Sequence, residues 1–536
     1  MKTFAPNIPV MRLWDHSLLC NRLTPLLSLL VPLCFVLLMI SAAPLGTALE
    51  FGTDEGYELM KGFLLSCGFA LYEEIWSDQP PLHTALLAFL FRLFGPSVLA
   101  ARLLSVAFAA LALWSFYELI RSRSGIIAAW IGAVLLALSP HFLQLSVSAM
   151  IVLPAMALGL FSVWILFQYR PELGRWLLFC SGLTMGLALQ IKLTAVLFIP
   201  ALVIELFLMH RRAGEAQRVA WHPFARSVLV WNVGVALGFG CLWALFPAAN
   251  ADFLLGTHFS EQTRTAFEAD GSFRQFHEAL WYDLGASAAA IAGLGWILLR
   301  RFWKLLFPAV LLITVYVFHC FHRPYWYFHY LHFAIPLAWL SAIALKEIFL
   351  YFLNADLSKF VRPPFSATLV YLLWAGLAAL LLSDLRQKAS QTWTAITAVP
   401  LVNQDPLVKE LRRHSHQAHW VVVDRSIHAF HAGIPVPPPL AVVSQKRVRS
   451  GRFTPKDLLA TIIQYKPELV ALQWQDRVDE ELIAYLSCEY VPCPGSDLPY
   501  LLVRRDMVAL ALVVQNLVRP RVSASGMAAA KVPASP

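Results

Sequence analysis

Charged residues are scarce in this chain. Of its 536 residues, 14% are Asp, Glu, Lys or Arg, whereas 58% are hydrophobic. Soluble globular proteins carry about 25% charged and about 45–50% apolar residues, so a water-soluble fold of this composition would expose large apolar patches and aggregate. The high apolar content excludes a disordered chain, and the lack of a short repeat excludes collagen and coiled coil. The composition therefore predicts a polytopic membrane protein.

Paired cysteine motifs are also absent. The eight cysteines are scattered and none belongs to a CxxC pair, which argues against a zinc framework and a disulfide scaffold. Cys488 and Cys493 are close enough in sequence to form a bridge if their region is extracytoplasmic, and the sequence leaves this open. No GxSxG, HExxH or P-loop motif points to another chemistry.

Long apolar runs are what the chain has in abundance. A spanning helix needs about 20 mostly apolar residues, and the number of such runs predicts about 11 transmembrane helices. The first run is longer than the roughly 7–15 apolar residues of a signal peptide, so we expect it to be retained. The runs lie near residues 24–44, 98–119, 125–142, 149–168, 174–191, 193–209, 227–247, 284–299, 305–321, 328–345 and 365–383.

Lys and Arg are distributed unevenly between the connecting segments. With a cytoplasmic N-terminus, the cytoplasmic segments hold 17 of them, whereas the outer loops, although longer, hold 6. This asymmetry sets topology, and it explains the net charge of +9 without a nucleic-acid partner. Eleven spans then place the C-terminal region outside. Two outer loops, 45–97 and 248–283, are too long to be mere connectors.

The chain divides into three parts by composition. We predict a membrane domain over residues 1–384, a small extracytoplasmic α/β domain over 385–505, and a low-complexity tail over 506–536. The first outer loop carries two amphipathic stretches, Glu55–Phe69 and Leu82–Phe94, which we expect along the membrane surface.

The C-terminal domain alternates between short strands and helices. A capping box, Thr454 with Asp457, marks the start of one helix. The expected strands are His419–Asp424 and Glu468–Trp474, and the expected helices are Pro455–Tyr465 and Val478–Leu486.

Asp54 and Glu55 follow the first span directly. Two adjacent carboxylates at a membrane boundary repel each other and lose hydration, which raises the pKa of one of them. Such a group suits general-base catalysis. The alternative is a structural role, with Asp54 as the N-cap of the next helix and Glu55 opposing the helix dipole.

Other polar residues gather at the outer boundary. Asp78 and Gln79 precede two prolines and would face the pocket of Asp54, or they form a turn in an aromatic belt. Lys192 lies between two apolar runs, where it either snorkels to the surface or binds an anion. Arg102 is either a further cation of the site or the partner of a carboxylate. An aromatic and basic cluster suggests a phosphate site and contains His322, Arg323, Tyr325 and His329.

Several of these segments together resemble a known family. Thr53-Asp54-Glu55-Gly56, Leu71–Leu82, Phe94–Ser97 and Ala101–Leu103 are similar to the first outer loop of GT-C glycosyltransferases. The similar branch contains protein O-mannosyltransferases and lipid A aminoarabinose transferases (glycosyltransferase family 39-like). Gly182–Pro200 and Tyr325–Pro336 resemble two further family segments, so that the likeness covers about residues 25–345.

The resemblance implies an enzyme of the bacterial inner membrane. Such an enzyme transfers a sugar from a polyprenyl phosphate to a lipid, glycan or protein acceptor at the outer face, with inversion, in lipopolysaccharide modification or protein glycosylation. Asp54 matches the acidic residue to which the family's catalysis is assigned, and Glu55 matches its neighbour. Lys192 and the Arg323 cluster match regions expected to hold the lipid phosphate.

One departure and two alternatives accompany this prediction. Family members often carry an acidic residue near 142–155, where this chain has His141 and Gln144 and no Asp or Glu, so a second carboxylate must come from Glu55, Asp78 or elsewhere. No cofactor and no metal site is predicted, although the carboxylates could hold a divalent cation. A non-enzymatic transporter or flippase would show charges near mid-span and two related halves, and a membrane assembly factor would not need the acidic loop.

Overall fold

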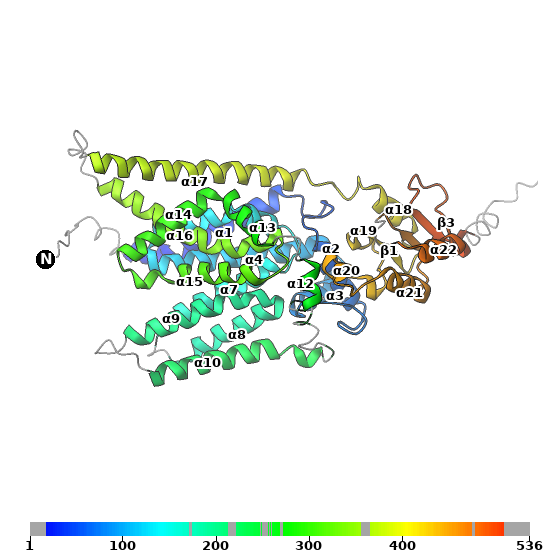
Figure 1. Cartoon of the computed structure of the whole chain (residues 1–536), viewed down its shortest axis with the longest axis horizontal. Helices are drawn as coiled ribbons and strands as arrows, with labels where there is room; N and C mark the ends of the chain where they lie inside the picture. Colours follow the sequence, from blue (N-terminus) through cyan, green and yellow to red (C-terminus); the bar gives the residue numbers. More distant parts are fainter. Residues whose placement is uncertain are drawn as a thin grey trace, which may run out of the picture.

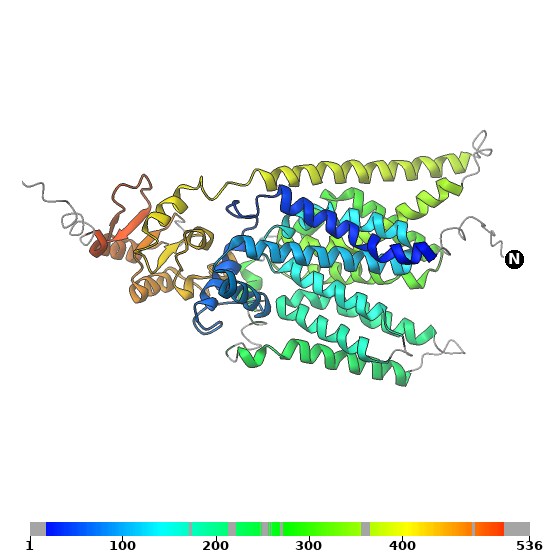
Figure 2. The ribbon, with the colours of Figure 1, turned by 180° about the vertical axis from the view of Figure 1, so that it is seen from behind.

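The computed structural model describes residues 18–508, apart from 171–173, 213–220, 247, 249–253, 255, 257, 259, 268–271, 355–364 and 474–477. A bundle of long helices forms one part of the molecule, and a smaller mixed domain lies beyond one end of it (Figure 1). The helices of the first outer loop lie between the two parts. Seen from behind, α1 runs along the bundle beside α4 (Figure 2). The predicted tail, from residue 509 on, lies outside the described residues.

Each of the predicted apolar runs coincides with helical structure. Within the described part of the chain, Val98–Ser124, Leu193–Arg211 and Tyr327–Leu350 are long and apolar enough to cross a membrane by length and composition, and six shorter apolar helices accompany them. The bundle contains α1 (Leu18–Ala42), α4 (Val98–Ser124), α5 (Ile126–Ala137), α6 (Pro140–Ser146), α7 (Val152–Phe167), α8 (Trp176–Ile191), η3 (Leu193–Phe198), α9 (Ile199–Arg212), α10 (Trp221–Gly240), α14 (Leu284–Leu299), α15 (Phe307–Phe321), α16 (Tyr330–Asn354) and α17 (Phe365–Thr397), with the short turns η4 (Trp243–Leu245), η5 (Trp303–Leu305) and η6 (Tyr327–His329).

The third predicted run, 125–142, is broken. Helices α5 and α6 meet at an angle of 68°. Pro140 opens α6 at its first position, and because proline has no backbone N–H and clashes with the preceding turn, α5 cannot continue through it.

Residues 45–97, which we predicted as the first outer loop, fold into a helical hairpin made of α2 (Glu55–Ser66) and α3 (Leu82–Phe94). Most of α2 is buried because it packs against α3 and the C-terminal domain. That it lies along the membrane surface stays a prediction. By contrast, α3 exposes Phe89, Leu93 and Phe94. The second outer loop contains α12 (Glu261–Ala266) and α13 (Ser272–Tyr282).

The C-terminal domain is a mixed α/β unit. Its sheet has the order β1-β2-β4-β3, with β1 and β2 parallel and the other pairs antiparallel. Val421 pairs with Leu469, and Leu469 with Val503. Its elements are α18 (Pro406–His414), β1 (Val421–Val423), α19 (Ser426–Ala432), η8 (Pro438–Leu440), α20 (Gln445–Arg449), α21 (Pro455–Tyr465), β2 (Leu469–Ala471), α22 (Glu480–Glu489), β3 (Tyr490–Pro492) and β4 (Leu501–Arg504).

The predicted elements of this domain are present, and two strands were missed. The capping box that opens α21 is confirmed, because Thr454 accepts the N–H of Asp457 and Asp457 accepts that of Thr454. The missed strands, β3 and β4, have only three and four residues. Cys488 and Cys493 are both free, and α17 runs without a break through the expected boundary at residue 384.

The C-terminal domain is fixed to the chain that leads into α2. The amide of Leu49 donates to the carbonyl of Pro400, and that of Val402 donates to the carbonyl of Thr47, both at 2.8 Å. A side chain at Gly56 would place its Cβ 2.8 Å from the backbone nitrogen of Ile427 in α19. This approach requires glycine, and it fixes the start of α2 against the domain.

Candidate functional site

Asp54 is the N-cap residue of α2, yet its side chain makes no capping hydrogen bond. Burial raises the pKa of its carboxyl to about 6, against the opposing charge of Lys192. The carboxyl is therefore not used as a helix cap. It can accept a proton near neutral pH, as a general base must.

Lys192 faces the same region from the junction of α8 and η3. The residue is 8% exposed, and its ammonium lies 5.0 Å from the centre of the Phe328 ring, so it does not snorkel into solvent. Burial lowers its pKa to about 8, while the charges of Asp54 and Asp78 oppose that shift. Asp54 and Lys192 thus lie near enough for each to act on the charge of the other.

Glu55 and Arg102 form a fully buried ion pair. Arg102 donates to both oxygens of Glu55, at 2.9 and 3.0 Å, and to the carbonyl oxygens of Leu45 and Ala48. Glu55 also accepts the backbone N–H of Ala149. The sequence left open whether Arg102 is a further cation of the site or the partner of a carboxylate, and the structure shows it paired with a carboxylate. The contacts of Glu55 are those of a residue that positions the loop.

Asp78 joins three distant segments of the chain. The Lys446 ammonium of the C-terminal domain donates to Asp78 Oδ2 at 3.0 Å, and His258 of the second outer loop lies 2.8 Å from Lys446 Nζ through its Nδ1. Burial alone would raise the pKa of Asp78, but Lys446 and His258 outweigh it and hold that pKa well below its usual range. Asp78 is therefore ionised and paired with Lys446 of the C-terminal domain.

A second buried ion cluster lies on α2. Lys61 donates to Glu58 at 2.8 Å, and His83 Nδ1 lies 3.3 Å from the other Glu58 oxygen. Burial would raise the pKa of Glu58, but Lys61 and His83 lower it to about 2. Glu55, Glu58 and Asp78 all have ion partners within 4 Å, whereas Asp54 has none among the described residues.

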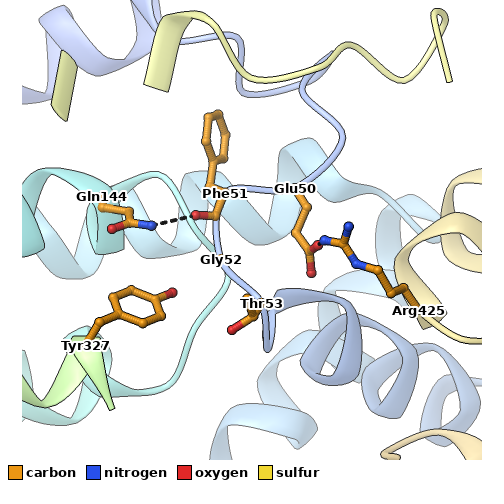
Figure 3. Close-up of a pocket in the computed structure, with 7 residues that line it drawn as sticks. All are labelled: Glu50, Phe51, Gly52, Thr53, Gln144, Tyr327 and Arg425. Atoms are coloured by element: carbon orange, nitrogen blue, oxygen red, sulfur yellow. Dashed lines mark hydrogen bonds and ion pairs between the residues drawn. The ribbon is translucent and has the colours of Figure 1, made fainter. Parts of the chain in front are cut away.

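An open pocket of about 390 Å³ is lined in part by the four residues that directly precede Asp54 (Figure 3). The Gln144 side-chain amide donates to the carbonyl of Phe51 at 3.0 Å, and Glu50 pairs with Arg425 of the C-terminal domain. A Cβ at Gly52 would lie 2.9 Å from the Tyr327 hydroxyl, which leaves no room for a side chain there. The lining residues are Glu50, Phe51, Gly52, Thr53, Gln144, Tyr327 and Arg425.

The predicted aromatic and basic cluster connects α15 to α16. His322 is influenced by the charges of Lys446 and Lys192, and burial, the largest cause, holds its pKa well below the usual value. Arg323 is half-buried and forms no ion pair with another described residue. Tyr325 and His329 are buried. The connection between α15 and α16 therefore lies near Lys192 and Lys446. That its residues bind a phosphate stays a prediction.

The sequence reasoning did not select four residues that shape this site. Glu58 and Lys61 had a usable signal, since opposite charges three residues apart on a helix form pairs. Lys446 and His258 gave no such signal in the sequence, because only the tertiary fold brings them into contact with Asp78.

Comparisons with known proteins support the sequence resemblance. Residues 78–236 match the sequence model of the dolichyl-phosphate-mannose-protein mannosyltransferase family. No curated protein matches the chain significantly.

Two solved structures share the fold. ArnT from Cupriavidus metallidurans, bound to undecaprenyl phosphate, superposes with a TM-score of 0.57 at 15% identity, over 90% of this chain and 97% of ArnT. The oligosaccharyltransferase AglB from Archaeoglobus fulgidus, in complex with an inhibitory peptide and a dolichol-phosphate, has a TM-score of 0.53 at 13% identity, over 84% of this chain and 69% of AglB. The predicted resemblance is confirmed: part of the chain matches the mannosyltransferase family model, and the chain shares its fold with ArnT and AglB.

Proposed function

We propose that this enzyme transfers a sugar from a polyprenyl phosphate to a lipid, glycan or protein acceptor at the outer face of the membrane, with inversion. The observation that carries the proposal is the juxtaposition of an unpaired carboxyl, Asp54, and a buried ammonium, Lys192. The lipid phosphates in the ArnT and AglB structures support a donor of this class.

The proposed reaction is a single displacement. The acceptor oxygen attacks the anomeric carbon of the sugar while its proton passes to Asp54, and the bond between that carbon and the phosphate oxygen breaks. Negative charge builds up on the departing phosphate. Lys192 stabilises that charge, together with Arg323 of the connection between α15 and α16, in a partly dry site where fixed cations contribute most to the rate.

The arrangement in the membrane is part of the proposal. Eleven helices span a bacterial inner membrane with the N-terminus in the cytoplasm, and the hairpin α2–α3 and the C-terminal domain lie outside. Because α17 is continuous to Thr397, we place the start of the extracytoplasmic domain after that residue instead of at 385.

Replacing Lys192 with Met tests the donor site. We expect the affinity for polyprenyl phosphate to fall about tenfold or more, which corresponds to the loss of about 1.4 kcal/mol from one charged contact. The measurement is binding of the lipid phosphate to the purified protein in nanodiscs. Lys304→Met is the matched control, because Lys304 is exposed in η5. Equal affinity of Lys192→Met and the control would refute the donor site.

The pH dependence of kcat/KM follows from the same two groups. Activity falls below about pH 6, because protonated Asp54 cannot accept a proton, and above about pH 8, because deprotonated Lys192 no longer attracts the phosphate. The profile is therefore bell-shaped. Lys192→Arg keeps its charge to higher pH, so its alkaline limb moves upward. An alkaline limb that stays in place in this variant contradicts the role of Lys192.

The acceptor is identified by mass spectrometry of the lipids, glycans and proteins of the cell envelope, with and without the enzyme. We expect one envelope component to lose a single sugar unit when the enzyme is removed. An unchanged envelope in a strain that makes the donor contradicts the proposed transfer.

A further inference from the structure

Four histidines gather where α15 joins α16: His319, His322, His329 and His332. The rings of His319 and His332 stack with their centres 5.4 Å apart, and His329 lies 5.3 Å from His319 and 5.5 Å from His322. One nitrogen from each of His319, His322 and His329 lies within 4.8 Å of the other two. This is a compact set of imidazole ligands from two helices and their connection.

Several nitrogens of these rings are unsatisfied. Nδ1 of His319, Nδ1 of His322 and Nε2 of His332 are buried without a hydrogen-bond partner among the described residues. Buried polar atoms nearly always have a partner, and orphaned ones often indicate an ion or a water. Three such atoms in one cluster point to a missing ligand.

The hydrogen bond between His319 and His332 orients one of the rings. Nε2 of His319 lies 3.1 Å from Nδ1 of His332. With the shared proton on His319, its Nδ1 carries a free lone pair inside the cluster. Metal-binding histidines typically have this arrangement, in which a neighbour bonded to the second nitrogen fixes the tautomer.

We propose that His319, His322 and His329 bind a divalent transition-metal ion of the Zn²⁺ class, with His332 orienting His319. Three neutral imidazoles suit zinc and its neighbours and do not suit Mg²⁺ or Ca²⁺, which take oxygen ligands. Nδ1 of His329 accepts the backbone N–H of Trp326 at 3.2 Å. Binding through His329 gives up this long hydrogen bond, so the ion must contribute more than that one contact.

The ion would connect α15 to the start of α16 across the segment that contains Arg323. Since His319 belongs to α15 and His329 to η6, a shared metal ion fixes the spacing of the two ends of that segment. The site is separate from the carboxylates of the first outer loop and does not depend on the proposed function.

Zinc binding by the full-length protein tests the proposal. The protein is purified on a tag without histidine, stripped with a chelator, incubated with Zn²⁺ and desalted, and its zinc is measured by mass spectrometry. We expect about one equivalent in the wild type, as for a three-histidine site, and a loss in His319→Ala and in His322→Ala. His210→Ala is the control, because His210 is buried elsewhere, against Ser227, and should bind zinc as the wild type does.

A second measurement does not depend on the folding of the variants. Co²⁺ added to the stripped wild type should produce the visible absorption bands of imidazole-bound cobalt, and Zn²⁺ should abolish them. A wild type that binds neither ion, or variants that keep the full equivalent of zinc, would overturn the proposal.

Discussion

We expect Asp54→Asn to abolish sugar transfer while leaving the binding of the lipid donor intact. The substitution keeps the shape of the side chain but removes the group that accepts the acceptor's proton, and a positioned general base contributes roughly 10²–10⁴-fold to a rate. In the wild type the negative charge of the Asp54 carboxylate lies near Lys192, where it repels the phosphate of the donor. The substitution removes this repulsion. The donor should therefore bind as tightly as before or more tightly.

Transfer is measured with a radiolabelled polyprenyl-phosphate sugar in nanodiscs, and donor binding is measured in the same preparation. Glu73→Gln is the matched control, since Glu73 is an exposed carboxylate of the same loop, and it should retain wild-type transfer. If Asp54→Asn keeps the activity of this control, Asp54 is not the base.

Arg102→Met should cause the largest loss of stability. It leaves the carboxylate of Glu55 buried without its counter-ion, and removing one partner of a buried pair costs about 3–5 kcal/mol. It also removes donors to three backbone carbonyl groups of the chain leading into α2, those of Leu45, Ala48 and Leu49. Arg102→Lys should restore only part of the loss, because an ammonium cannot reproduce the bidentate contact.

The free energy of unfolding of these variants is measured in detergent with chemical denaturant. Arg274→Met is the control. Its pair with Glu278 is exposed, and such pairs contribute about 0–1 kcal/mol. A loss in Arg102→Met no larger than in this control would mean that the buried pair does not hold the loop.

Local sequence predicted the parts of the fold whose causes are local. The apolar runs marked the helices, because the length of an apolar stretch is itself the signal for a membrane span. The capping box of Thr454 and Asp457 located the start of α21 to the residue. The bend at Pro140 was missed although its cause was visible in the sequence, because the apolar run continues through it.

The sequence indicated which charged residues to consider for the site, but it did not indicate their ion-pair partners. Asp54 and Lys192 were selected as candidates because a charged residue beside an apolar run is conspicuous. Their roles depended on partners that sequence does not reveal. Glu55 has the same local sequence context as Asp54, yet its carboxylate is paired with Arg102, which is 47 residues away in the sequence. Asp78 is likewise paired with Lys446, which is 368 residues away.

The most direct test of the account is a cryo-EM structure of the enzyme with bound polyprenyl phosphate in a nanodisc. We expect the phosphate to lie within hydrogen-bonding distance of the Lys192 ammonium, on the side of the bilayer that holds the C-terminal domain, with the Asp54 carboxyl facing the same cavity. A phosphate bound away from Lys192, or at the opposite end of the helix bundle, would contradict it.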